Sequence, residues 1–247
     1  MKNEMIAAIA GLAVSGIASA AFVNYSVVST AVNNSGQSLV RHELFANFNG
    51  PTDTVLNVFN FQASGGWAAH TSAAGGFWHK DNLDTASPGI ISQSIGSWSP
   101  TMTGSALGNR PFDSFLLIGG NPVAANTTTA DPSWGGNGAN PNGWNVAQIP
   151  TGASPLYNDL GWFNASPPNV QGRVGTAPNT ATQVKLGQFM LSANDTAFRT
   201  YTLRIAVNNA TVSAPVFSDG SFTLGAVPAP GAIALLGLAG LTGRRRR

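Results

Sequence analysis

The sequence predicts an all-β protein, an antiparallel β-sandwich of jelly-roll-like type with long loops rich in Gly, Asn and Trp. Three observations lead to this prediction. Short apolar segments recur along the chain with period-two alternation, Gly, Pro and Asn separate them, and no long helical period lies between the two ends. The chain is 43% hydrophobic and 9% aromatic, which is too much for a disordered protein, so we expect the body to fold around a core.

The expected strands follow one another from the start of the body to its end. In chain order they are 21–32, 40–48, 55–62, 112–118, 184–191 and 199–209. The alternation is clearest in 199–209, which we expect to be a central strand with 184–191 as its neighbour. The side chains of this strand that should point into the core are Tyr201, Leu203, Ile205 and Val207. We expect 216–224 to be a hairpin, because Asp219-Gly220 supplies the positive φ angles of a tight turn.

Two long segments, 65–108 and 119–178, interrupt this pattern, and together they hold all six tryptophans. Loops of such length are usually functional or disordered. We expect ordered loops that the tryptophans pin to the core. The alternative is that some tryptophans stack on sugar rings, and the candidates, which lie among Asn and Asp residues, are Trp134, Trp144 and Trp162.

The sequence lacks the common catalytic patterns, and we expect the protein not to be an enzyme. It has no cysteine, no G-x-S-x-G elbow and no phosphate-binding loop. His42-Glu43 begins like a zinc-protease motif, but Ala46 stands where the second histidine is needed. No catalytic and no cofactor-binding residue is therefore assigned.

No metal site is expected either, although two weak candidates exist. His79 and Asp81 lie close together, but their spacing fits no named site. Calcium is the better alternative, because Asp131 and Asn137 offer hard oxygen ligands in a glycine-rich loop. Turn formation alone also explains Asp, Asn and Gly there.

The charge of the body argues against nucleic-acid binding. Without residues 1–20 and 227–247, seven Lys and Arg remain against nine Asp and Glu, a formal net charge of −2. The basic residues are scattered, whereas a nucleic-acid footprint needs them on one face. Charged residues make up 9% of the chain, against a typical value of about 25%. The surface must therefore be built from uncharged polar groups, which suits an extracellular matrix.

Residues 1–20 have the layout of a secretory signal peptide. Lys2 gives a positive start, an apolar stretch follows, and Ala18 and Ala20 complete an A-x-A pattern of small residues. We expect cleavage after Ala20, which leaves 21–226 as the mature β-sandwich domain.

Residues 227–247 combine a short motif, an apolar span and a basic cluster. The span, 229–243, would reach about 22 Å as a transmembrane helix, somewhat short of the about 30 Å hydrocarbon core. Positive residues resist translocation and stay in the cytoplasm. The membrane stop consists of Arg244, Arg245, Arg246 and Arg247.

This tail resembles the PEP-CTERM sorting domain of bacteria, and the resemblance covers only 227–247. The motif residues are Val227, Pro228, Ala229 and Pro230, with Ala229 where the family usually has Glu. The resemblance implies processing by exosortase, a membrane-embedded cysteine transpeptidase, in a bacterium that produces exopolysaccharide. The protein would be anchored transiently in the inner membrane and then reach the cell surface or extracellular matrix.

Three functions remain open for the body. The favoured one is a structural or adhesive surface protein associated with extracellular polysaccharide. A carbohydrate-binding module is the first alternative, and a secreted hydrolase with two facing carboxylates is the second. The sequence alone identifies neither a ligand nor an oligomeric state.

Overall fold

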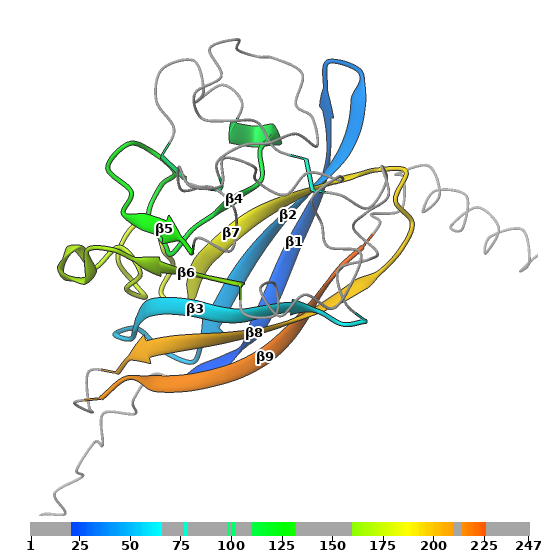
Figure 1. Cartoon of the computed structure of the whole chain (residues 1–247). Coiled ribbons are helices and arrows are strands. Elements are labelled where there is room, and N and C mark those ends of the chain that lie inside the picture. The colour runs from blue at the N-terminus through cyan, green and yellow to red at the C-terminus, as the bar shows by residue number, and fades with distance from the viewer. Residues whose placement is uncertain are drawn as a thin grey trace, which may run out of the picture.

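The computed structural model describes residues 21–65, 77–78, 98, 100–101, 110–131, 160–209 and 214–225. Within these ranges the regular secondary structure is almost entirely β-strand (Figure 1). The elements in chain order are β1 (Phe22–Asn34), β2 (Gln37–Phe48), β3 (Thr54–Ala63), β4 (Phe115–Leu116), β5 (Thr128–Ala130), β6 (Leu160–Asn164), the short 3-10 helix η5 (Pro167–Asn169), β7 (Gln183–Ser192), β8 (Arg199–Asn208) and β9 (Val216–Leu224).

The strands form two antiparallel sheets. The four-stranded sheet has the order β1-β2-β7-β4, and the five-stranded sheet has the order β5-β6-β3-β8-β9. One core cluster takes side chains from both sheets. At its centre the Phe61 ring stacks with Phe189 of the other sheet at 5.7 Å and with Tyr201 at 5.3 Å. The predicted all-β class is confirmed, and the two packed antiparallel sheets are those of a sandwich.

Strand β8 matches its prediction closely. It lies between β3 and β9 in the interior of the five-stranded sheet. Its four predicted core residues are 0–3% exposed: Tyr201, Leu203, Ile205 and Val207. Period-two alternation thus identified both the strand and the face that it buries.

The predicted pairing of 184–191 with 199–209 is wrong. β7 pairs with β2 and β4, whereas β8 pairs with β3 and β9 in the opposite sheet. Alternation shows which side of a strand is apolar, but any strand with the same pattern can serve as its partner.

The predicted hairpin at 216–224 is also wrong, because these residues form the single strand β9. Asp219 lies opposite Arg204 of β8, and its carboxylate accepts hydrogen bonds from that guanidinium at 2.5 and 2.6 Å. A Cβ atom on Gly220 would lie 2.7 Å from the Tyr25 ring. Gly220 therefore permits close approach of β1 rather than a turn.

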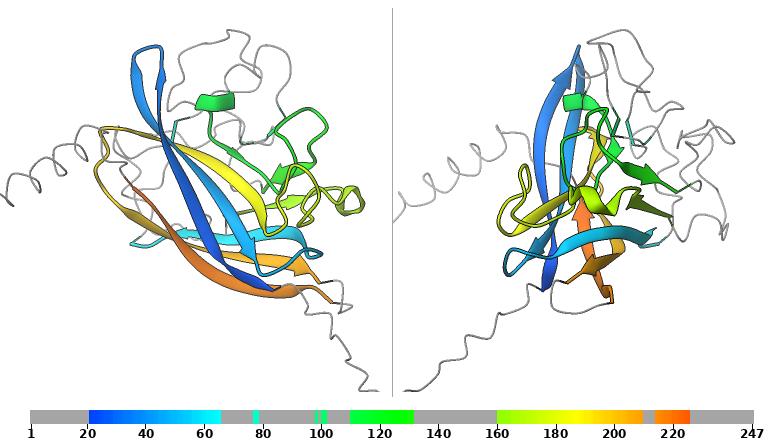
Figure 2. Two further views of the ribbon diagram at one scale, coloured as in Figure 1. Left: turned by 180° about the vertical axis from the view of Figure 1, so that it is seen from behind. Right: turned by 90° about the vertical axis from the view of Figure 1, so that its left-hand side faces the viewer.

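A tight turn does join β1 to β2. Its two residues, Ser35 and Gly36, have φ angles of 51° and 93°, as a type I′ turn requires. The hairpin extends beyond the rest of the four-stranded sheet (Figure 2).

The segment 119–178, predicted as a long loop, contains β5, β6 and η5. The prediction of one continuous loop is wrong there, because these strands are too short to show alternation. The prediction of pinning tryptophans fits Trp98, which is 1% exposed and packs against the Phe77 ring at 5.8 Å.

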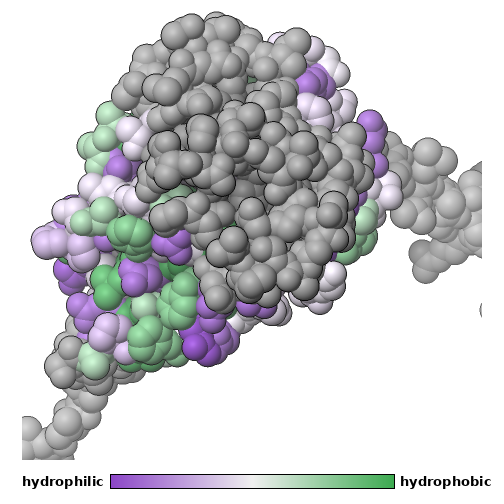
Figure 3. Space-filling view, in the orientation of Figure 1, coloured by the Kyte–Doolittle hydropathy of each residue, from purple (hydrophilic) through white to green (hydrophobic). Residues whose placement is uncertain are grey.

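Apolar and polar residues are interspersed over the part of the visible face that Figure 3 colours. Phe217 of β9 is 60% exposed and packs edge-on against Phe59, over which the Arg204 guanidinium lies at 5.9 Å. Within the described part of the chain, no helix is long and apolar enough to span a membrane. The predicted terminal helices, at 1–20 and 229–243, lie outside it.

Candidate functional site

A pocket of about 340 Å³ opens on the face of the four-stranded sheet that points away from the core. Its size lies at the small end of ligand-binding pockets, which hold about 300–1,000 Å³. Strands β2 and β7 form its floor, and segments around 110–122 and 178–180 flank it. The lining residues are Arg41, Glu43, Phe45, Arg110, Pro111, Phe115, Leu117, Gly120, Asn121, Pro122, Pro178, Asn179, Thr180, Gln183, Lys185 and Gln188.

Strand alternation places three lining residues on one face of β2. Arg41, Glu43 and Phe45 are two positions apart, so they point to the same side of the sheet. His42 and Leu44, between them, are 1% and 0% exposed and point into the sandwich. The charged residues of β2 therefore lie on its outer face only.

A bulge in β7 supplies the other two floor residues. Leu44 pairs with Gly187, but the next residue, Phe45, pairs with Lys185, so Leu186 is an extra residue. In a regular strand Lys185 and Gln188 would lie on opposite faces. The extra residue shifts the alternation, and both line the pocket.

Gly187 lets strand β4 approach this bulge. Phe115 and Leu116 pair with Gln188 and Gly187, and a Cβ atom on Gly187 would lie 3.1 Å from the Phe115 carbonyl oxygen. The Phe115 ring forms part of the pocket wall, with the Lys185 ammonium 5.5 Å from its centroid.

Glu43 holds two cations on the pocket floor. Lys185 Nζ donates to Glu43 Oε1 at 2.6 Å, and Arg41 Nε lies 3.6 Å from Glu43 Oε2. Burial lowers the pKa of the Lys185 ammonium, and Arg41 and Arg110 lower it further, whereas the hydrogen bond and the charge of Glu43 raise it. Arg41 Nε is buried and has no hydrogen-bond partner among the described residues.

Gln188 connects the floor to the wall at 110–113. Its Nε2 donates to the carbonyl oxygens of Arg110 and Asp113, both at 2.8 Å. Its Oε1 lies 3.4 Å from Lys185 Nζ. The segment that carries the Arg110 side chain is thereby fixed relative to the sheet.

A network of amide side chains supports the opposite wall. Gln171 Nε2 donates to Ile118 O at 3.1 Å, Asn126 Oδ1 at 3.3 Å and Thr128 Oγ1 at 3.1 Å. Its Oε1 accepts from the backbone nitrogen and the hydroxyl of Thr127, both at 3.1 Å. One side chain thus uses both ends of its amide to join three segments.

Two consecutive glycines shape the loop above this network. Gly119 and Gly120 have φ angles of 60° and 72°, and a Cβ atom on Gly119 would lie 2.1 Å from the Gln171 carbonyl oxygen. Asn126 Nδ2 donates to the carbonyl oxygens of Gly119 at 3.1 Å and Asn121 at 3.0 Å. The position of Asn121 on the pocket rim follows from these contacts.

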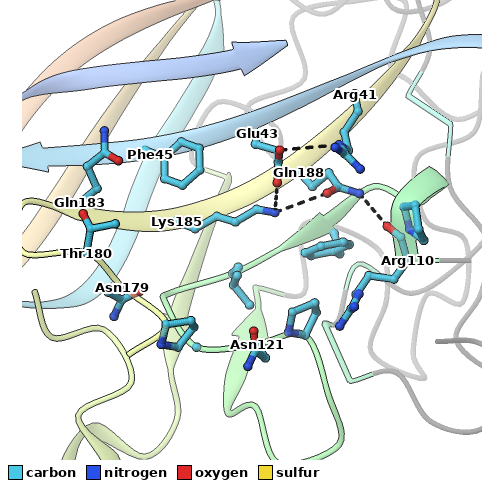
Figure 4. Close-up of a pocket in the computed structure, with 16 residues that line it drawn as sticks. Arg41, Glu43, Phe45, Arg110, Asn121, Asn179, Thr180, Gln183, Lys185 and Gln188 are labelled. Atoms are coloured by element: carbon cyan, nitrogen blue, oxygen red, sulfur yellow. Dashed lines mark hydrogen bonds and ion pairs between the residues drawn. The ribbon is translucent and has the colours of Figure 1, made fainter. Parts of the chain in front are cut away.

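The lining residues separate by chemistry along the pocket (Figure 4). We name the two groups the cationic end (Arg41, Arg110 and Lys185) and the amide end (Asn179, Thr180 and Gln183). Asn179 Nδ2 donates to the carbonyl oxygens of Gln171 at 2.6 Å and Arg173 at 2.9 Å.

Polar pairing continues from the amide end across the sheet. Gln183 Nε2 donates to Asn47 Oδ1 at 2.9 Å, and Asn47 Nδ2 donates to Asn24 Oδ1 at 2.6 Å. The pocket therefore leads into a strip of uncharged amides that crosses β7, β2 and β1.

Trp162 fits the expected pinning of its loop to the core and not the sugar-stacking alternative. This residue lies in β6, is 1% exposed, and packs against Phe61 with ring centroids 6.0 Å apart. Its Nε1 donates to the Leu117 carbonyl oxygen at 2.9 Å, so it secures the pocket wall from the core side. Trp134 and Trp144 lie outside the described residues.

Of the metal candidates, only Asp131 lies within the described residues. Asp131 follows β5, is half-buried, and has a pKa raised by burial. His79, Asp81 and Asn137 lie outside the described ranges. No cluster of three His, Asp or Glu side chains occurs within those ranges.

Sequence reasoning did not find the pocket. Arg41 and Glu43 stand at alternate positions of a strand, which is a weak signal for a charged outer face. Lys185 and Gln188 carry no such signal, because only the bulge places them together. The walls come from segments whose partners lie far away in the sequence.

The hydrolase alternative needs two facing carboxylates. Among the described lining residues only Glu43 is acidic. His42, the nearest histidine in sequence, is buried on the other face, where its Nδ1 lies 2.7 Å from Ser29 Oγ. Burial lowers the pKa of His42 to about 4, against the opposing charge of Asp195, so the ring is neutral at pH 7.

The predicted processing residues lie outside the described ranges. They are Ala18, Ala20, Val227, Pro228, Ala229, Pro230, Arg244, Arg245, Arg246 and Arg247. Comparison of the chain with protein-family models, with curated proteins and with solved structures finds no match.

Proposed function

We propose that the chain is an exported, surface- or matrix-targeted protein with a structural or adhesive role, and that its pocket holds extracellular polysaccharide. The observation that carries the proposal is the lining of the pocket. Aromatic rings, amide side chains and cations line one open cavity on an exposed sheet face.

This lining suits a sugar. Saccharides present hydroxyl groups that donate and accept hydrogen bonds, and amide side chains do both. Asn121, Asn179 and Gln183 supply such groups, while Phe45 and Phe115 offer apolar surface for the C–H face of a ring. The supports at Gln171 and Gln188 fix these groups before any ligand arrives, which reduces the entropy cost of binding.

The two ends of the sequence support the proposed location of the protein. Residues 1–20 have the order of a signal peptide, and 227–247 resemble the PEP-CTERM tail. We propose that an exosortase-type enzyme recognises this tail while it is held in the inner membrane. The released domain, 21–226, then acts at the cell surface or in the matrix.

The proposal is tested by the retention of the full chain, purified in detergent, on immobilised polysaccharides. The panel contains neutral and acidic polymers. We expect at least one polymer to retain the protein, and Gln183→Ala to lower that retention by about fivefold, the usual effect of losing one or two hydrogen bonds.

Asn208→Ala serves as the matched control, because Asn208 is exposed at the end of β8 and does not line the pocket. It should be retained like the wild type. If no polymer retains the protein, or if both variants behave alike, the pocket is not a polysaccharide site.

A further inference from the structure

The pocket concentrates positive charge that the rest of the body lacks. Of the seven Lys and Arg in 21–226, three form the cationic end, and Glu43 is the only acidic residue among the described residues that line the pocket. The described lining residues therefore have a formal net charge of +2, while the body as a whole has −2. Such a local excess raises the concentration of anions at the site.

This positive charge is incompletely paired. Glu43 is shared between Lys185 and Arg41, and Arg110 has no ion-pair partner among the described residues. Elsewhere in the body Arg199 and Arg204 each have a carboxylate of their own. The cationic end thus differs from the ordinary ion pairs of this protein.

Arg41 shows the same incomplete pairing at the level of one atom. Its Nε is buried without a hydrogen-bond partner within the described part of the chain, and the nearest carboxylate oxygen is 3.6 Å away. An unpaired buried donor on a charged group is costly. A ligand oxygen near this guanidinium would supply the missing partner.

At the opposite end, the lining residues that the structure describes carry no charge. Asn179, Thr180 and Gln183 offer amide and hydroxyl groups, and Phe45 lies between the two ends (Figure 4). A matching ligand therefore carries an anion at one end and hydroxyl groups at the other, with an apolar ring face between them.

Building on the polysaccharide-binding function proposed above, we infer that the pocket selects an acidic saccharide, with the carboxylate of a uronate unit at the cationic end and its ring hydroxyls at the amide end. A guanidinium matches a planar carboxylate through two parallel hydrogen bonds. A cavity of about 340 Å³ suits a small ring unit of a chain rather than a large cofactor.

The test is calorimetric titration of the full chain with four probes. Digalacturonate carries both the ring and the carboxylate, the neutral digalactose carries the ring alone, and acetate and inorganic phosphate carry the anion alone. We expect digalacturonate to bind at least about tenfold more tightly than digalactose, because one charge-assisted hydrogen bond contributes about that factor. It should also bind at least about tenfold more tightly than acetate or phosphate, because these lack the ring hydroxyls that bond to the amide end.

Arg110→Gln is the informative variant, because this exposed side chain is needed for no described contact of the fold. It should reduce the affinity for digalacturonate about tenfold and leave that for digalactose unchanged. Arg173→Gln is the control, because it removes an exposed arginine outside the pocket. It should bind like the wild type.

The outcomes separate this inference from the function on which it rests. Equal binding of digalacturonate and digalactose overturns the acidic preference and leaves the polysaccharide function standing. Equal binding of acetate or phosphate and digalacturonate shows a simple anion site and also overturns the inference. If none of the probes and none of the immobilised polymers binds, both proposals fail.

Discussion

His42 lies on β2 between Arg41 and Glu43, but it points into the core rather than into the pocket. Its pKa in the folded protein is about 4, against an ordinary value of 6.5, because burial disfavours the charged ring. Asp195 opposes this shift without overcoming it. Acidification therefore favours the unfolded chain, where the same ring takes up a proton easily.

We predict that the free energy of unfolding decreases as the pH falls from 6.5 towards 4. The stability linked to neutral His42 is complete above pH 6.5 and is lost as pH falls towards the folded pKa, by up to about 3 kcal/mol. His42→Gln, which cannot titrate, should show a flatter profile in the same window. Urea unfolding at pH 7 and pH 4.5 measures both. Parallel profiles for the two proteins would contradict the assignment.

Lys185 gives a second pH-dependent prediction, in the alkaline range. Burial and the nearby Arg41 and Arg110 lower its pKa, and an arriving carboxylate, like Glu43, would raise it. Binding of digalacturonate should therefore weaken as pH rises through the lowered pKa of Lys185, because the neutral amine attracts no anion.

The control for this prediction is Lys185→Arg, since a guanidinium stays charged across the whole range. Titrations at pH 7 and pH 9.5 should show an affinity that falls for the wild type and stays level for the variant. A level affinity in the wild type would mean that Lys185 does not contact the anion.

At the scale of the element, the close packing of β9 against β1 requires a glycine at position 220. Gly220 faces Tyr25 of β1, and the Tyr25 hydroxyl donates to the Leu203 carbonyl oxygen at 3.2 Å. Gly220→Ala should lower the free energy of unfolding by about 1–3 kcal/mol, the usual cost of overpacking. Ser221→Ala, at the exposed neighbouring position, should change it little. Urea unfolding of the two variants decides whether the contact matters.

The strands show which parts of the fold could be predicted from the sequence. Tyr201 and Leu203 alternate with polar residues, so both the strand and its buried face followed from the pattern. The partner of a strand did not follow, because pairing depends on contacts between distant segments. Gly220 looked like part of a turn, since glycine signals both positive φ and close approach. β5, with three residues, is too short to alternate visibly.

The candidate site was less predictable than the fold. A pocket needs a floor, two walls and a known register, and each of these depends on tertiary contacts. Gln171 illustrates this point: it lines no part of the pocket, yet its amide joins the segments that do. Nothing in the local sequence distinguishes it from a loop glutamine that makes no such contacts.

At the scale of the whole molecule, export should leave a well-anchored new N-terminus. We predict cleavage after Ala20, one residue before β1 begins at Phe22. The backbone nitrogen of Ala21 donates to Asn49 Oδ1 at 2.7 Å, a contact that the new amino group could keep. Intact-mass analysis of the exported protein should give a chain that starts at Ala21. A retained Met1 would show that the segment is not a cleaved signal.

The tail makes a further prediction at this scale. Each Lys or Arg near an anionic leaflet contributes about 1 kcal/mol of attraction, and moving one arginine to the bilayer centre costs about 2.5–3.5 kcal/mol. Replacing all four terminal arginines by Ser should therefore weaken the membrane stop and release unprocessed protein. Fractionation with a tag placed before Val227 detects that release.

The matched variant for the tail is Pro228→Ala combined with Pro230→Ala. It keeps the arginines but removes the extended strip that proline imposes before the span. This variant should stay in the membrane and remain uncut. If both variants were processed like the wild type, the tail would not be a sorting signal but only a hydrophobic end.

The extra residue in β7 makes the pocket sensitive to chain length as well as to residue type. Before Leu186 the side chains that face the pocket stand at odd positions, and after Gly187 they stand at even positions. A substitution in either half alters one side chain. A one-residue deletion between them would turn Lys185 or Gln188 inward and bring an apolar neighbour out. Transfer of this pocket to another sandwich would therefore require the extra residue to be transferred together with the charged residues.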